Sequence, residues 1–169
     1  MIPCLYDSSE TEYADNGIGK LSDTYNPEFF RMAVCKDAVE FEVTRHKAAK
    51  MKLTFHCKPQ RWSVAGQKPV RMDAPGTIRN PFSFASQPII RVYGTGAGVL
   101  YVGDNAITIH SIDQYVDLNC ETHNAYNAGG FCNQTILSED FPELAPGSTR
   151  ITWTEGISYV EVTPRWWTL

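Results

Sequence analysis

Residues 89–110 read IIRVYGTGAGVLYVGDNAITIH and decide the fold of the second half of the chain. Three short runs, Ile89–Tyr93, Val99–Val102 and Ile107–His110, are rich in β-branched and aromatic residues and have the length of strands. The stretches between them, Gly94–Gly98 and Gly103–Asn105, consist of small and polar residues that favour turns. The segment therefore predicts antiparallel strands joined by short turns.

The same spacing continues towards the C-terminus. Further strands are expected at Tyr115–Leu118, Thr135–Leu137, Thr149–Thr154 and Ser158–Thr163. Ser111–Asp113 is expected to separate two of the strands, and Glu121–Asn127 is expected to form one helical turn. Many short strands with a turn every ~8–12 residues are typical of an antiparallel β-sandwich or jelly roll. No helical pattern of a dozen residues interrupts them, which argues against alternating βαβ units.

The segment before this region predicts a small α+β unit. Asn26–Ala33 is expected to open a short helix, because Asn26 can cap it and Pro27 suits the first helical turn. Val39–Thr44 and Met51–Cys57 alternate apolar and polar residues, so they are expected to pair as strands through a connection around His46–Ala49. His56 falls on the polar face of its strand and is expected to be solvated.

Glycine and proline punctuate the remaining segments. Residues 63–80 are dense in both and are expected to form a linker with at most one short strand, near Val70. Residues 1–22 are polar and rich in turn formers, so an N-terminal arm is expected there. The chain is thus divided into an arm (1–22), a small domain (23–62), a linker (63–80) and a sandwich domain (81–169).

Composition limits the class of protein. The 169 residues carry a net charge of −4, which argues against a nucleic-acid partner. Residues 1–80 hold twelve Lys and Arg against ten Asp and Glu, and residues 81–169 hold three against nine. No apolar run approaches the ~20 residues of a membrane helix, so no membrane association is expected. The N-terminus lacks the pattern of a secretory signal.

Five cysteines at irregular spacing favour reduced thiols in the cytoplasm. Cys120, His123 and Cys132 offer three zinc ligands, but no fourth soft ligand stands at a convincing spacing, so neither a metal nor another cofactor is expected. Buried thiols are the favoured interpretation, and a redox pair between Cys120 and Cys132 stays open.

Catalytic motifs are weak throughout. Gly94, Gly96 and Gly98 do not have the spacing of a dinucleotide loop, and a strand rather than a helix follows them, so they are expected to form a hairpin turn. Six acidic residues are candidates for the two carboxylates of a glycosidase, but nothing in the sequence marks any of them as buried. They are Asp104, Asp113, Asp117, Glu121, Asp140 and Glu143. The chain is therefore not expected to be an enzyme.

The C-terminus supplies candidate interface residues. Arg165, Trp166 and Trp167 follow the last expected strand. Neighbouring residues on a strand point to opposite faces, so one indole is expected in the core and the other outside, where a tryptophan beside an arginine suits a protein or a sugar contact. The alternative is that both rings pack against neighbouring loops.

Several motifs, in this order, resemble siphophage distal tail proteins. They are Asp23–Ala33, Leu53–Trp62, Asn80–Gly94, Asp140–Gly147, Ile151–Gly156 and Pro164–Leu169. The first two resemble the end of that family's ring-forming domain, and the others resemble its second domain. The resemblance covers residues 23–169, and Arg61 and Trp62, at the end of the second motif, join the interface candidates.

The resemblance implies a non-enzymatic structural protein of the virion tail, assembled in the bacterial cytoplasm. Such proteins form a hexameric ring that joins the tail tube to the baseplate or hub and carry a galectin-like β-sandwich. The family has a longer ring domain than residues 23–62, and residues 1–7 and 16–22 resemble the opening of the tail-associated hub protein instead. The alternative function is a carbohydrate-binding module that attaches to surface glycans through aromatic residues such as Trp153, Trp166 and Trp167.

Overall fold

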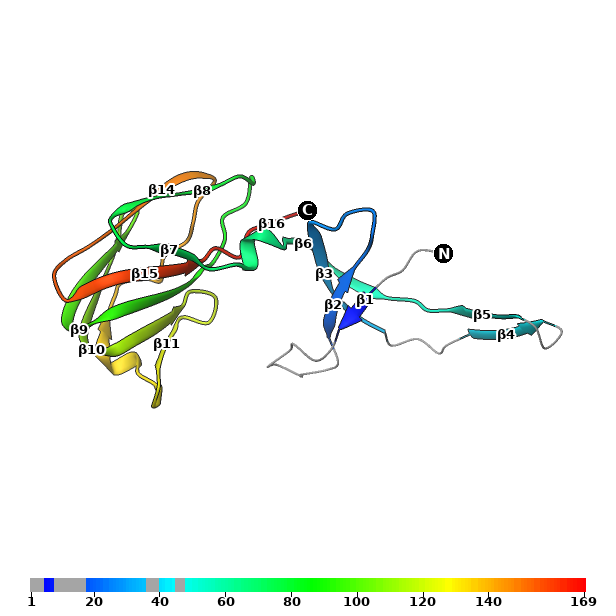
Figure 1. Cartoon of the computed structure of the whole chain (residues 1–169), viewed down its shortest axis with the longest axis horizontal. Coiled ribbons are helices and arrows are strands. Elements are labelled where there is room, and N and C mark those ends of the chain that lie inside the picture. Colours follow the sequence, from blue (N-terminus) through cyan, green and yellow to red (C-terminus); the bar gives the residue numbers. More distant parts are fainter. Residues whose placement is uncertain (1–4, 8–17, 36–39, 45–47) are drawn as a thin grey trace. The chain divides into compact units, whose positions relative to one another are not determined.

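The computed structural model describes residues 5–7, 18–35, 40–44 and 48–169 (Figure 1). Residues 1–4 and 8–17 of the expected arm, with Cys4, lie outside these ranges, as do His46 and Lys47 of the expected connection. The chain divides into two compact units. The first unit is residues 1–64 with Leu169, and the second is Ala65–Thr168.

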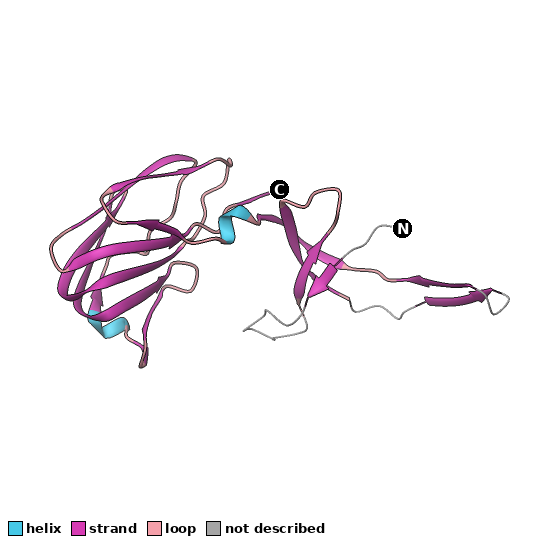
Figure 2. Cartoon of the chain, in the orientation of Figure 1, coloured by secondary structure: helices cyan, strands magenta, loops and turns pink. Residues whose placement is uncertain are grey.

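The second unit consists of antiparallel strands and two short 3-10 helices (Figure 2). Its elements are η1 (Ala65–Gln67), β7 (Val70–Met72), β8 (Gly76–Asn80), β9 (Ile89–Val102), β10 (Asn105–Asn119), β11 (Asn124–Asn127), β12 (Gly130–Phe131), η2 (Asn133–Thr135), β13 (Ile136–Leu137), β14 (Gly147–Trp153), β15 (Ile157–Thr163) and β16 (Trp167–Thr168). The prediction of a mainly β, antiparallel sandwich is confirmed.

The long hairpin of β9 and β10 belongs to both layers of this sandwich. Residues 89–94 of β9 pair with β15 and with residues 114–119 of β10, and β7 and β11–β12 extend that layer. Residues 100–102 of β9 pair with β14 and with residues 105–107 of β10, and β8 and β13 complete the other layer. The two halves of one hairpin therefore hold the two layers together.

One continuous hydrophobic core lies between the layers. Alternate residues of each strand turn inwards, as a period of two requires. Ile90 and Val92 of β9 are fully buried with Val160 and Val162 of β15, and Leu100 further along β9 is buried as well. Met72, Ile136, Phe141, Trp153 and Trp166 pack against this cluster while remaining partly exposed. The alternation in the sequence thus becomes the core of the fold.

The hairpin turn expected over Gly94–Gly98 is wrong, because β9 runs through it without a break. Over residues 94–98 the strand passes from one layer to the other, and we call this part the bend of β9. The turn before β15 crosses the bend closely. A Cβ atom on Gly94 would lie 2.0 Å from the carbonyl oxygen of Gly156, and one on Gly98 would lie 2.8 Å from Cγ1 of Ile157. The glycines permit close approach of two backbones rather than a chain reversal.

Three other expectations in this unit are wrong because the segments concerned pair with strands that are distant in sequence. Ser111–Asp113 does not separate two strands but lies within β10, beside a register shift between Ile109 and Ile112. Residues 63–80 are not a linker, because β7 pairs with β15 and β8 pairs with β14. Glu121–Asn127 is not a helical turn, because Asn124–Asn127 forms β11 against β10.

The first unit is built on one antiparallel sheet. Its strands are β1 (Leu5–Asp7), β2 (Gly19–Ser22), β3 (Phe29–Val34) and β6 (His56–Ser63), which pair in that order. Among the residues described there, the buried hydrophobic side chains are those of Phe30 and Ala33. A sheet with so few buried apolar side chains gains little from the hydrophobic effect on its own.

A separate hairpin joins β3 to β6. It consists of β4 (Glu40–Thr44) and β5 (Ala48–Lys52), which pair antiparallel, so the partner strand begins at Ala48, within the expected connection, rather than at Met51. The second strand does not extend over Met51–Cys57, because β5 ends at Lys52 and β6 begins at His56. His56 is exposed, in line with its expected place on a polar face. No helix among the described residues is long and apolar enough to cross a membrane.

The short helix expected over Asn26–Ala33 is wrong. Oδ1 of Asp23 accepts hydrogen bonds from the backbone N–H groups of Tyr25 and Asn26, both at 2.9 Å, and the N–H of Phe29 donates to the carbonyl oxygen of Asn26. The segment is therefore a turn that feeds β3. Asparagine followed by proline suits a β-turn as well as a helix start, and pairing of β3 with β2 and β6 decides between them.

Candidate functional site

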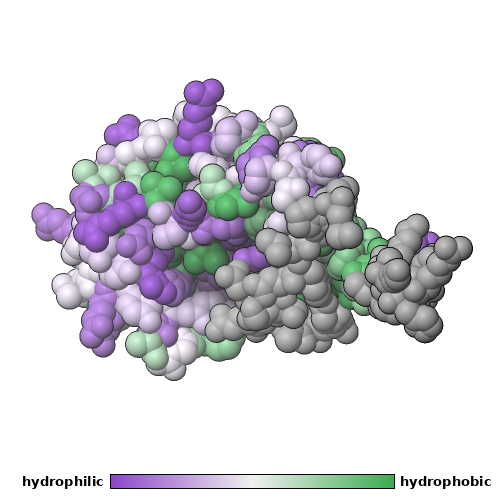
Figure 3. Space-filling view, turned by 45° about the vertical axis from the view of Figure 1, so that its right-hand side comes forward, coloured by the Kyte–Doolittle hydropathy of each residue, from purple (hydrophilic) through white to green (hydrophobic). Residues whose placement is uncertain are grey.

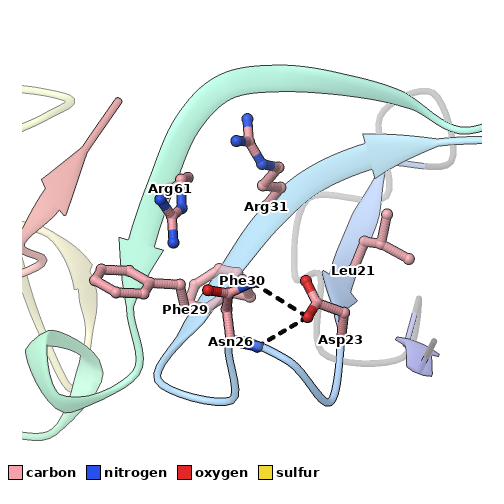
Figure 4. Close-up of a pocket in the computed structure, with 7 residues that line it drawn as sticks. All are labelled: Leu21, Asp23, Asn26, Phe29, Phe30, Arg31 and Arg61. Atoms are coloured by element: carbon pink, nitrogen blue, oxygen red, sulfur yellow. Dashed lines mark hydrogen bonds between the residues drawn. The ribbon is translucent and has the colours of Figure 1, made fainter. Parts of the chain in front are cut away.

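A pocket of about 310 Å³ opens on the sheet of the first unit (Figure 4). It is lined by Leu21 of β2, Asp23 and Asn26 of the following turn, Phe29, Phe30 and Arg31 of β3, and Arg61 of β6. The lining thus combines two cations, one acid and several apolar groups. Its size lies at the lower end of the range for ligand pockets, about 300–1,000 Å³.

The turn at Asp23 forms the fixed rim of this pocket. Besides the two backbone N–H groups, the Asn26 side-chain amide donates to the same carboxylate at 3.4 Å (Figure 4). The hydrogen bond from the backbone N–H of Asn26, aided by that of Tyr25, holds the pKa of Asp23 below its ordinary value of 3.8. Arg61 adds a weaker electrostatic contribution in the same direction. Asp23 is therefore ionised at neutral pH.

Two arginines stand directly opposite each other across the pair of strands at this pocket. The register places Arg31 of β3 against Arg61 of β6. The guanidinium of Arg61 lies 4.6 Å from the centre of the Phe29 ring, and Nη1 of Arg31 donates to the carbonyl oxygen of Pro59 at 3.1 Å. Arg61, an interface candidate from the sequence, therefore lines a pocket together with Arg31, which the sequence did not single out.

Trp62, the neighbouring candidate, lies outside the pocket lining. It is half-buried on β6 and stands opposite Phe30 in the register. Consecutive residues of a strand face opposite sides of a sheet, so Arg61 and Trp62 serve different surfaces. The structure brings Arg61 together with Arg31 and Phe29 rather than with its sequence neighbour.

The candidates at the C-terminus belong to the second unit. Arg165 adopts a positive φ of 55°, its N–H donates to the carbonyl oxygen of Gly66 at 2.7 Å, and its Nη2 lies 2.6 Å from Oε2 of Glu121. Only 17% of the Arg165 side chain is exposed. This arginine ties the chain end to two distant segments of the sandwich.

Both C-terminal tryptophans are half-buried. Trp166 packs against the hydrophobic core. Trp167 stacks on Phe84 with ring centres 4.5 Å apart, and its Nε1 donates to the carbonyl oxygen of Ala85 at 3.0 Å. This arrangement matches the alternative in which both rings pack against neighbouring segments, and not the one in which one ring points into solvent.

The outer face of the layer containing β15 carries a row of tyrosines that sequence reasoning missed. Tyr159, Tyr93 and Tyr115 are register neighbours on β15, β9 and β10. The rings of Tyr93 and Tyr159 stack at 4.3 Å, and the guanidinium of Arg71 lies 3.9 Å from the centre of the Tyr159 ring. We call this row, with Arg71 and Arg91, the tyrosine ladder. The three tyrosines are 22 to 66 positions apart in sequence, and only strand order brings them together.

The charged and polar groups of the tyrosine ladder are paired with neighbouring side chains of the same layer. Arg91 forms a two-point ion pair with Asp117, at 2.6 and 2.7 Å, and its guanidinium lies 4.6 Å from the centre of the Tyr115 ring. That carboxylate raises the pKa of Arg91 further above its ordinary value. The hydroxyl of Tyr93 donates to Glu161 at 3.2 Å. Because Tyr159 is covered by a tyrosine and an arginine, the row stabilises the sheet and leaves little open ring for stacking a sugar.

Exposed apolar side chains elsewhere on the second unit are dispersed. Phe131 and Leu137 are 69% and 65% exposed on the short strands β12 and β13. Figure 3 shows one face of the molecule, on which small apolar patches alternate with hydrophilic side chains. Scattered exposed apolar residues are ordinary for protein surfaces and do not define a site.

Four of the six acidic residues that are candidates for a hydrolytic pair interact with other groups. Asp117 pairs with Arg91 and Glu121 pairs with Arg165. Oε1 of Glu143 accepts a hydrogen bond from the Gln87 amide, and Oδ1 of Asp140 accepts one from the N–H of Phe141. Within the described residues, no group of three His, Cys, Asp or Glu side chains is placed to hold a metal.

Cys120 and Cys132 are free thiols buried in the core of the sandwich. His123, the third candidate zinc ligand, is exposed and stacks on Phe141 instead. Burial raises the pKa of the Cys120 thiol from its ordinary value of 9.0 to about 12. The interpretation as buried thiols therefore agrees with the geometry.

We expect alkylation to distinguish these cysteines. At pH 8, iodoacetamide should modify the exposed Cys57 at least about 100-fold faster than Cys120, because only an accessible thiolate reacts. Peptide-level mass spectrometry of the folded chain measures both rates, and urea should remove the difference. Equal rates in the folded protein, or a disulfide-linked Cys120–Cys132 peptide, would contradict this prediction.

Comparison with known proteins gives a likeness of fold. No protein-family model matches the chain, and no curated protein is similar to it in sequence. The structure is similar to the crystal structure of the phage SPP1 protein Dit (gp 19.1), described as a paradigm of the hub adsorption apparatus in phages infecting Gram-positive bacteria. The TM-score is 0.64 at 14% sequence identity, and the match covers 90% of this chain but only 65% of SPP1 Dit.

Proposed function

We propose that this chain is a non-enzymatic structural component of a phage tail tip, of the distal tail protein type. The observation that carries the proposal is the likeness of fold to a phage hub protein over 90% of the chain. The order of the sequence motifs from Asp23 to Leu169 supports it independently. The virion tail is the proposed location, and the tail tube and the hub proteins are the proposed partners.

The first unit gives a physical reason for assembly. Its described residues bury few apolar side chains, so neighbouring subunits or partner proteins supply the burial that the sheet lacks. Arg61 and Trp62 lie on its strand β6 and are proposed to contribute to those contacts. The second unit has its own core and is proposed to sit as a separate domain on the assembly.

Light scattering coupled to size-exclusion chromatography tests this role. We expect the full chain to form a defined oligomer, a hexamer if the ring of the family is retained, and to bind the tail tube or hub protein of the same phage. Residues 65–168 alone should remain monomeric, because the contacts are assigned to the first unit. A full chain that stays strictly monomeric and ignores both partners would overturn the proposal.

The carbohydrate-binding alternative receives no comparable support. A sugar site needs an open aromatic ring beside polar groups, yet Trp153, Trp166 and Trp167 are all packed within the second unit. The tyrosine ladder is likewise covered by its own arginines. The role proposed for the sandwich is therefore mechanical support rather than recognition of glycans.

A further inference from the structure

In the pocket of the first unit, two residues of like charge, Arg31 and Arg61, stand directly opposite each other on neighbouring strands. Like charges directly opposite each other on neighbouring strands destabilise a sheet. Arg31 and Arg61 occupy such a pair, on one face of β3 and β6 (Figure 4). Elsewhere in the protein such a position holds opposite charges: Arg91 of β9 stands directly opposite Asp117 of β10 and forms an ion pair with it.

No carboxylate of the described residues forms an ion pair with either arginine. Arg31 donates a hydrogen bond to the carbonyl oxygen of Pro59, and Arg61 makes a cation–π contact with the ring of Phe29. Asp23 lies on the rim, but its Oδ1 is already occupied by the N–H groups of its own turn. Most of the ten guanidinium N–H donors of the pair therefore remain for a further ligand.

Both arginines are held in place before any ligand arrives. The contact with the Phe29 ring restricts the Arg61 guanidinium, and the hydrogen bond to Pro59 anchors one end of Arg31. A guanidinium fork matches the two oxygens of a carboxylate, and restricting its motion in advance reduces the entropy lost on binding. The pocket is thus built for a planar anion.

Charge selects the class of anion. Two arginines and the ionised Asp23 give the pocket a net charge of +1, which balances a carboxylate but not a phosphate dianion. Leu21 and Phe29 add apolar wall for the methylene groups that carry a side-chain carboxylate. The volume of about 310 Å³ admits a side chain rather than a folded element.

We propose that the Arg31–Arg61 pocket binds an Asp or Glu side chain presented by an acidic segment of a partner protein. The chemistry of the site stands on the pocket alone, and the view that the partner is a tail-tip protein rests on the proposed function. The carboxylate enters the pocket that both arginines line and accepts charge-assisted hydrogen bonds from their guanidinium groups.

Titration of the full chain with acetyl-Gly-Glu-Gly-amide tests the site. The readout is the pair of Nε–Hε signals of Arg31 and Arg61 in nitrogen-15 NMR spectra. We expect saturable shifts of both signals with this peptide and none with its Gln counterpart. Inorganic phosphate at pH 7.5 should bind more weakly than the Glu peptide. Absence of shifts, or tighter binding of phosphate, would overturn the proposal.

Matched variants separate binding from folding. Arg61→Gln should weaken binding of the Glu peptide at least about tenfold, since a lost charge-assisted pair is worth about 1.4 kcal/mol or more. Lys58→Gln removes the same charge from an exposed residue of the same strand and should leave affinity within about twofold. Arg61→Gln should also leave the melting temperature nearly unchanged, because relief of the repulsion with Arg31 offsets the loss of the contact with Phe29. Binding by Arg61→Gln that equals the wild type would refute the site.

The outcomes also separate this site from the wider role. If the chain assembles with tube or hub protein but its arginines ignore the peptide, the carboxylate site is wrong and the tail-tip proposal stands. If the arginines bind the peptide but the chain remains monomeric and binds neither protein, the site stands and the tail-tip proposal is wrong.

Discussion

Replacing Gly156 with alanine should lower the free energy of unfolding of the sandwich by about 3–5 kcal/mol. Gly156 has a φ of +96°, which strains any residue with a Cβ atom, and that atom would lie 2.0 Å from the carbonyl oxygen of Ala97. The turn before β15 would have to move away from the bend of β9, and the hydrogen bond from Thr95 N–H to the Gly156 carbonyl would be lost. Urea denaturation followed by circular dichroism measures the change.

Two glycines of the bend itself, Gly96 and Gly94, act as controls for the two causes of destabilisation, which are backbone strain and steric clash. Gly96 has a φ of +82° but open space around its missing Cβ, so Gly96→Ala should cost about 1–2 kcal/mol, from backbone strain alone. Gly94 has no positive φ but would place its Cβ 2.0 Å from the Gly156 carbonyl oxygen, so Gly94→Ala isolates the steric clash. If Gly156→Ala costs no more than Gly96→Ala, the close crossing of the two backbones is not what the bend requires.

Removing residues 65–79 should cost the sandwich most of its stability. A fragment of residues 80–168 lacks β7 and all of β8 except Asn80, and with them the buried Ile78 and the packing of Met72. Loss of one buried isoleucine alone costs about 2–5 kcal/mol, and each kcal/mol lowers the melting temperature of a domain this size by about 4–8 °C. We expect a melting temperature at least about 15 °C below that of residues 65–168, measured by differential scanning calorimetry.

The longer fragment is the matched control. Residues 65–168 retain every strand of the second unit, and the hydrogen bond from Arg165 N–H to the Gly66 carbonyl, so this fragment should melt as one cooperative unit. The shorter fragment should also aggregate, because β14 and β15 lose the strands that cover their edges. Similar melting of the two fragments would show that residues 65–79 are a linker after all.

Strand content was predictable wherever burial alternates with a period of two. The strands expected at Thr149–Thr154 and Ser158–Thr163 correspond to β14 and β15, because each has one face in the core and one in water. Continuity of strands was not predictable in the same way. Gly94–Gly98 carries the composition of a turn, and its place in β9 depends on the Gly156 turn, some sixty residues further along.

The helix expected at Asn26 failed because its local signals are ambiguous. Asparagine followed by proline begins helices and turns equally well, and the six residues of β3 are too few for a stable helix without tertiary contacts. Hydrogen bonding to β2 and β6 on both sides settled the outcome. A similar argument explains β7 and β8, whose glycine- and proline-rich surroundings resemble a linker until their partner strands are known.

The candidate site was only half visible in the sequence. Arg61 was singled out through a family motif, but nothing in the sequence pairs it with Arg31, thirty positions earlier. That pairing follows from the register of β3 against β6, which includes an irregularity between Arg31 and Ala33. The tyrosine ladder escaped notice for the same reason, since its three rings come from three separate strands.

By itself the sequence determined the class of fold, because apolar and polar residues alternate along each strand and so indicate which face of that strand is buried. Only the tertiary structure decided where strands end, which strands are neighbours and which side chains share a surface. Those properties depend on contacts between residues far apart in the chain, as between Gly94 and Gly156 or between Arg31 and Arg61. Register is a relation between two strands, so neither strand alone encodes it.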